Sequence, residues 1–252
     1  MKIFQYTLAA FGSIATLQAA TITQIDSNAA GEDWETNSSW GWNTATGGTA
    51  NPGEYAGNDF ITPEGFTART ETGSNVSFAG ASLTVYGILA LKSGNNSSAV
   101  KTVNDLRLAG TISNYVPSYS STVQTLAGNL TIIGDSLLTG PTDDGRNITV
   151  TSQVSGGMGF TVNHSGNTGT KYTYSNATNT FAGTWLVSSA NLIFESSEST
   201  GNGDVIVDGG VFQILDDWDA GQSLTVNGGT IDFGSNQWVV SSLSIGAIFS
   251  FF

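Results

Sequence analysis

The sequence predicts an all-β protein folded as a β-solenoid, a parallel β-helix of stacked coils, behind an irregular N-terminal cap. Three observations predict this fold. Apolar–polar–apolar tripeptides recur at intervals near 20 residues, and Thr, Ser and Asn fill the alternate positions. Helix-favouring charged residues are scarce, since the 252 residues include only seven Lys and Arg beside 32 Gly. A mainly helical fold is therefore excluded.

Residues 1–20 have the pattern of a secretory signal peptide. Lys2 is the only charge, the stretch from Ile3 to Leu17 is mostly apolar, and Ala19 and Ala20 are small residues suited to cleavage. No later stretch of about 18 apolar residues predicts a transmembrane helix. We therefore expect export across the inner membrane, to a secreted or cell-surface location.

Residues 21–78 lack the clean repeat and are interpreted as a cap over the first coil, because stacked repeats need a covered end. The segment contains three closely spaced tryptophans, Trp34, Trp40 and Trp42, among turn-forming residues. Their aromatic faces offer a candidate platform for sugar rings. The alternative is that they form the small core of the cap, because Trp is usually buried.

The solenoid repeats are expected over residues 79–252. The first members of the tripeptides are separated by 23, 24, 18, 57, 19 and 19 residues, and two further candidates, 160–162 and 185–187, divide the long gap. The seven tripeptides are Leu83–Val85, Leu106–Leu108, Leu130–Ile132, Ile148–Val150, Val205–Val207, Leu224–Val226 and Leu243–Ile245.

Two glycine pairs, Gly209-Gly210 and Gly228-Gly229, each separate two alternating segments. An Asx-Gly turn between such segments is typical of a β-hairpin, which would give an antiparallel sandwich or barrel. A β-arc at each pair would instead stack the segments in parallel. We favour the arc, because the repeat length is almost constant and stacked polar residues can hydrogen-bond along the axis. Eight or nine coils would form a rod of roughly 40 Å.

The repeat resembles bacterial autotransporter-associated β-strand repeat proteins, also called passenger-associated transport repeat proteins. The resemblance rests on residues 179–187 (NTFAGTWLV), with Leu192 in the following strand, and on residues 201–210 (GNGDVIVDGG). One departure is Thr184, where the family has a second Gly. The resemblance implies a right-handed parallel β-helix that is exported to the envelope, commonly within a large surface protein or adhesin.

Composition and motifs exclude several kinds of chemistry. A net charge of −13 disfavours nucleic acid, and the absence of Cys excludes disulfides and Cys-based metal sites. The single histidine, His164, lies in a polar segment that predicts a solvent-facing turn, and no GxSxG motif accompanies it. We therefore expect a protein that is not an enzyme, with no cofactor and no metal.

Two acidic clusters offer alternatives to this expectation. Asp143 and Asp144 beside Arg146 are the nearest approach to the acid and base of a polysaccharide lyase, and Asp216, Asp217 and Asp219 could supply oxygen ligands for calcium. Both clusters are also typical of turns between coils. No lyase motif and no calcium-binding nonapeptide supports either site.

The leading functional hypothesis is a non-catalytic exported solenoid that acts as a surface stalk or adhesin-like passenger. The alternatives are a carbohydrate-binding or matrix module that uses the three tryptophans, and a polysaccharide lyase. Expected partners are extracellular glycans or other surface proteins. The chain ends in the apolar residues Ile248, Phe249, Phe251 and Phe252, which we interpret as a last coil, a truncation, or an edge for end-to-end self-association.

Overall fold

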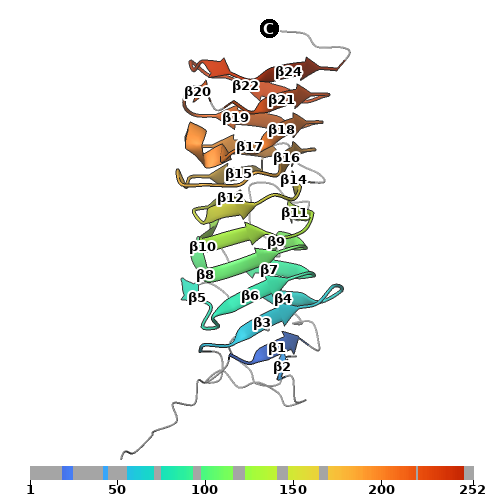
Figure 1. Ribbon diagram of the computed structural model, residues 1–252, viewed down its shortest axis with the longest axis vertical. Coiled ribbons are helices and arrows are strands. Elements are labelled where there is room, and N and C mark those ends of the chain that lie inside the picture. Colours follow the sequence, from blue (N-terminus) through green and yellow to red (C-terminus); the bar gives the residue numbers. More distant parts are fainter. Residues whose placement is uncertain are drawn as a thin grey trace, which may run out of the picture.

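Successive coils of the chain stack along one axis and form a β-solenoid, as the sequence predicted. In the computed structural model the axis runs from β1 to β24, which lie near opposite ends of the stack (Figure 1). The structure describes residues 19–24, 42–44, 56–70, 75–92, 98–115, 123–140, 147–164, 170–219 and 221–246. The side chains of residues 42–44 and 115 are not among those described.

Two large sheets make up most of the described chain. The first, of 13 strands, contains β1 (Thr21–Gln24), β2 (Trp42–Thr44), β3 (Asp59–Thr62), β5 (Val76–Ser77), β6 (Ser82–Val85), β8 (Ala99–Leu108), β10 (Val123–Ile132), β12 (Asn147–Val150), β13 (Gln153–Gly156), β15 (Lys171–Tyr174), β17 (Asn191–Phe194), β19 (Val211–Ile214) and β22 (Thr230–Asp232). The second, of nine strands, contains β4 (Thr67–Arg69), β7 (Ile88–Lys92), β9 (Thr111–Tyr115), β11 (Ser136–Thr139), β14 (Phe160–Val162), β16 (Thr184–Val187), β18 (Asp204–Val207), β21 (Ser223–Val226) and β24 (Ser242–Ile245).

A third side closes each coil. The long strand β10 contributes to two sides of its coil. Its first part pairs with β12 on the first side, and its last part pairs with β13 on the third side. Further along the axis this third side becomes irregular. It consists there of residues 178–182, the 3-10 helix η2 (Ser197–Thr200), and the short paired strands β20 (Trp218–Asp219) and β23 (Trp238–Val239). The coil is therefore roughly triangular in outline.

The stacking register places equivalent residues of successive coils beside one another. Leu83 lies beside Leu106, and Leu106 beside Leu130, through parallel pairing. On the second sheet Leu224 lies between Val205 and Leu243 in the same way. The recurring tripeptides of the sequence thus form continuous ladders, because each inward side chain stays above its counterpart.

The glycine pair at Gly209-Gly210 connects β18 of the second sheet to β19 of the first. The hairpin alternative is therefore wrong, and the turn is an arc between stacked strands. The corners themselves hydrogen-bond from coil to coil, since the Val211 N–H donates to the Ala190 carbonyl at 3.0 Å and the Thr230 N–H to the Gly210 carbonyl at 2.8 Å. This short corner explains why the repeat near the C-terminal end falls to 19–20 residues.

The interior of the stack changes character along the axis. Between β14 and β19 the core is aromatic, and the buried Trp185 ring lies 4.5 Å from Phe181 and 4.8 Å from Tyr174, measured between ring centroids. The coils before β14 instead bury several polar side chains, among them Lys101, Asn114 and Gln124. The connections from the second sheet back to the first are longer in these coils, as between Tyr115 and Val123.

Parallel stacking begins inside the region that we expected to be a cap. Ile22 of β1 lies beside Phe60 of β3, and Phe60 lies beside Leu83 of β6. β4 likewise pairs with β7 of the second sheet. Both ladders therefore continue without a break past residue 79, the expected start of the solenoid repeats. Only β2 departs from the pattern among the described strands, because it pairs with β1 in the antiparallel direction.

The arc at Gly210 provides a test of the stacked corner. Gly210 and Gly221 have the same φ of 69°, but a Cβ at Gly210 would lie 2.1 Å from the Ala190 carbonyl oxygen, whereas one at Gly221 would have no atom within 4 Å. We expect Gly221→Ala to cost about 1–2 kcal/mol through its positive φ alone. Gly210→Ala should cost clearly more in urea unfolding, and equal costs would contradict the arc geometry.

Candidate functional site

The structure describes little of the predicted tryptophan platform. Trp34 and Trp40 lie outside the described residues, and Trp42 lies in β2 with its backbone beside Gln24. Asp143, Asp144 and Arg146, the residues of the lyase hypothesis, also lie outside them, as do the C-terminal residues 247–252. The glycan-binding and lyase alternatives and the self-association hypothesis therefore stay predictions.

His164 does not occupy a solvent-facing turn, so this expectation was wrong. Its side chain is only 1% exposed and lies at the corner where the second sheet ends. The ring Nδ1 lies 3.2 Å from the Tyr172 hydroxyl, and Nε2 lies 3.3 Å from the Thr170 hydroxyl. The polar sequence around His164 does not reveal this burial, because its partners Thr170 and Tyr172 lie at the start of the next coil. Its surroundings are those of a buried structural residue.

Two buried tyrosines flank this corner and differ in their partners. Tyr172 contacts His164, whereas the Tyr174 hydroxyl has no hydrogen-bond partner in the described structure. Burial raises the pKa of Tyr172 well above its usual value. Burial, and then the neighbouring Tyr172, also raises the pKa of Tyr174. Both phenols therefore remain protonated in the folded protein at pH values where exposed tyrosines ionise.

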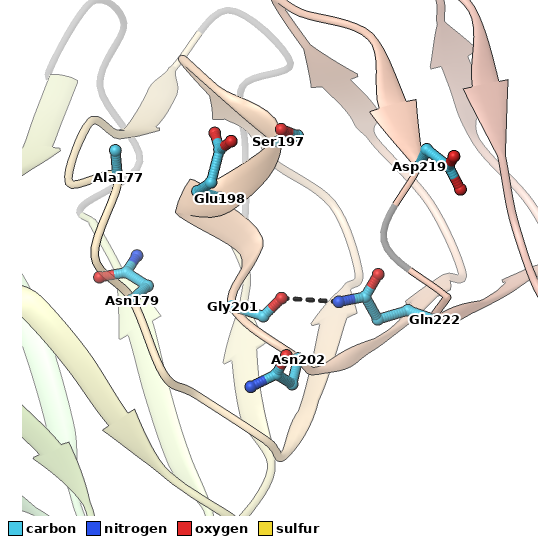
Figure 2. Close-up of a pocket in the computed structure, with 8 residues that line it drawn as sticks. All are labelled: Ala177, Asn179, Ser197, Glu198, Gly201, Asn202, Asp219 and Gln222. Atoms are coloured by element: carbon cyan, nitrogen blue, oxygen red, sulfur yellow. Dashed lines mark hydrogen bonds between the residues drawn. The ribbon is translucent and has the colours of Figure 1, made fainter.

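A polar cleft opens on the irregular third side, beside η2. We refer to it as the η2 cleft; it has a volume of about 300 Å³ and is lined by Ala177, Asn179, Ser197, Glu198, Gly201, Asn202, Asp219 and Gln222. Figure 2 shows Glu198 and Asp219 on opposite sides of the cleft, with the Gln222 amide below both and bonded to Gly201. The lining residues come from three successive coils, so stacking alone brings them together.

Hydrogen bonds hold the backbone of η2 against the stack. Asn179 donates from Nδ2 to the Ser199 carbonyl at 2.6 Å and accepts the Val154 N–H at 2.7 Å. The indole of the buried Trp185 donates to the Thr200 carbonyl at 2.9 Å. From the other side, Gln222 donates from Nε2 to the Gly201 carbonyl at 2.6 Å. The backbone carbonyl groups of residues 199–201 are thus held by side chains from the coils on both sides.

The η2 cleft presents negative charge. Glu198 and Asp219 are its only ionisable lining residues, and both are exposed to solvent. Hydrogen bonding from the Glu198 backbone N–H, and then from the Ser197 and Ser196 hydroxyls, lowers the pKa of Glu198. Its carboxylate is therefore ionised at neutral pH. The arrangement offers oxygen atoms to a ligand and has no basic side chain in its lining.

Sequence reasoning found one residue of this cleft and missed the rest. Asp219 belongs to the acidic cluster that offers oxygen ligands for calcium, but Asp216 and Asp217 stabilise the turn instead. Asp216 accepts the Asp217 N–H at 2.9 Å, and Asp217 accepts the Gln237 N–H at 2.8 Å. The useful signal was residues 196–200 (SSEST), where alternation stops between two strands. This pattern predicts an irregular segment, but it does not predict which residues of the adjacent coils lie beside that segment.

Comparisons with protein-family models, curated proteins and solved structures found no match to this chain. Within the described residues, no helix is long and apolar enough to cross a membrane. The same residues contain no group of three or more His, Asp or Glu side chains placed to hold a metal ion. The fold class is therefore established from the stacking itself, and the autotransporter repeat resemblance remains a prediction.

The two tyrosines form a matched pair for testing the buried corner. Tyr172→Phe removes the hydroxyl that contacts the buried His164, and we expect it to lower the free energy of unfolding by about 1–3 kcal/mol. Tyr174→Phe removes a buried hydroxyl without a partner, and should leave stability unchanged or raise it by about 1 kcal/mol. Urea unfolding measures both, and equal losses would contradict the assigned contact.

Raising the pH should lower the free energy of unfolding through the same two tyrosines. Because their pKa values are raised on folding, the stability they contribute is complete below the unfolded-state value of about 10 and falls as pH rises above it. Each tyrosine should reduce the free energy of unfolding by about 1.4 kcal/mol per pH unit above that point. A Tyr172→Phe/Tyr174→Phe variant should show a shallower decline, and an unchanged slope would refute the burial argument.

Proposed function

We propose that this chain is an exported β-solenoid that acts as a non-catalytic stalk or adhesin-like passenger at the cell surface. The observation that carries the proposal is the unbroken parallel pairing of the nine-stranded second sheet from β4 to β24. A stack of this kind extends in one direction and presents long lateral faces. Such faces project a binding surface away from an anchor without requiring an enclosed pocket.

The outward faces suit contact with solvent and with extended partners. On the first sheet Thr125, Thr149 and Thr173 stack in one column, and on the third side the Thr131 and Ser155 hydroxyls lie 3.1 Å apart. The net charge of −13 keeps the rod soluble and disfavours nonspecific association with other acidic surfaces. These features support a surface role together with the signal pattern of residues 1–20.

Export is the part of this proposal that is tested most directly. The full chain, expressed in a Gram-negative bacterium, should leave the cytoplasm and lose the signal segment near Ala20, because residues 3–17 supply the apolar region that the export machinery recognises. Cell fractionation and intact-mass measurement would show both. Phe11→Asp should retain the uncleaved chain in the cytoplasm.

Thr21→Asp is the matched control, because it adds the same charge at an exposed position beyond the expected cleavage site. It should be exported like the unmodified chain. Cytoplasmic retention of the unmodified chain with residues 1–20 intact would overturn the proposal, as would export of Phe11→Asp at an unchanged level.

A further inference from the structure

We propose that the last described coil, which ends in β24, is a self-association surface that joins two copies of this chain tail to tail. β24 lies near one end of the stack (Figure 1). Among the described residues, β22 and β24 are the terminal strands of the first and second sheets, and each pairs on one side only. Their free edges present the backbone N–H and C=O groups that stack one coil on the next.

The inward side chains of this coil are exposed, although their counterparts one coil earlier are buried. Leu243 is 57% exposed, whereas Leu224, its partner in β21, is 3% exposed. Ile245 and its partner Val226 differ in the same way, at 46% and 5%. In the part of the chain that the structure describes, five of the nine exposed large apolar side chains lie near this end: Leu215, Phe233, Val239, Leu243 and Ile245. Such a concentration of apolar surface is typical of an interface.

The edge of β24 lacks the features that usually discourage pairing between proteins. Exposed edge strands commonly carry charged residues or Pro. β24 has the sequence SLSI, without a charge, although the net charge of the chain is −13. The strand that would meet a second acidic copy therefore adds no local repulsion, and a second copy supplies an edge with the same alternation of Ser and apolar residues.

The opposite end of the stack determines how the two copies are oriented. Head-to-tail stacking would pair β22 of one copy with β1 of the other, but β1 already pairs with β2 on one side and with β3 on the other. A two-fold axis through β24 instead places this strand against itself in the antiparallel direction. Pairing centred on Ser244 brings Leu243 opposite Ile245 of the second copy, so both apolar residues of each strand meet apolar partners.

Sedimentation of the purified chain over a range of concentrations tests the proposal. Because the joint consists of one short strand from each copy, we expect a weak dimer with a dissociation constant of about 10⁻⁵–10⁻⁴ M. Leu243→Asp should weaken dimerisation by about tenfold or more, because it places a charge in the joint. Ile88→Asp is the matched control, since Ile88 is also an exposed apolar residue of the second sheet but lies in β7, far along the stack. It should leave the dissociation constant within about twofold.

Disulfide formation tests the register of the two strands. The chain contains no Cys, so a disulfide in a single-cysteine variant must join two copies. Pairing centred on Ser244 places its two Cβ atoms about 4.5–5.5 Å apart, so Ser244→Cys should give a cross-linked dimer under mild oxidation. Ser242→Cys is the matched control, because it is exposed on the same face of the same strand. Its two copies would lie roughly 13 Å apart and should cross-link far more slowly.

Two results would overturn the proposal. One is a chain that stays monomeric at every concentration, which would mean that its own residues or a different partner cover this edge. The other is cross-linking of both cysteine variants at the same rate, which would indicate random collision only. Export plays no part in either measurement, so failure here is separate from failure of the proposed function.

Discussion

The structure depends on backbone pairing between successive coils in a constant register. Each strand exchanges backbone hydrogen bonds with the coils on both sides of it, so a strand shifted by one residue would turn its apolar side chains outward. Leu83, Leu106 and Leu130 occupy one such ladder, which continues to Val154 of β13. Every corner must also stack, so the arcs hydrogen-bond from coil to coil as the strands do, for example between Val211 and Ala190.

The two halves of the stack meet this constraint with different interiors. Near the C-terminal end the corners are short, and large rings such as Trp185 and Phe194, 5.1 Å apart, fill the coil. In the earlier coils the connections are longer, and buried polar groups such as Asn114 and Gln124 lie near them. The change shows that coil length and core composition vary together while the ladders continue.

The η2 cleft arises where the third side stops forming a regular strand. The ladders of the first and second sheets hold the coils together at this level, so the third side is free to carry a short helix. Its carbonyl groups are then satisfied by side chains, including Asn179, Trp185 and Gln222, rather than by a neighbouring strand. Irregular structure supported by a rigid stack is a common place for binding residues.

The sequence by itself determined the all-β class, the inward tripeptides and the coil period, because each follows from alternation and spacing along the chain. Tertiary structure alone decided that the turn at Gly210 is an arc, since Asx-Gly suits either turn and only stacking distinguishes them. It also decided the burial of His164 and the placement of Glu198 and Asp219 on opposite sides of one cleft. These depend on which residues of different coils lie at one level of the axis, and no local pattern records that.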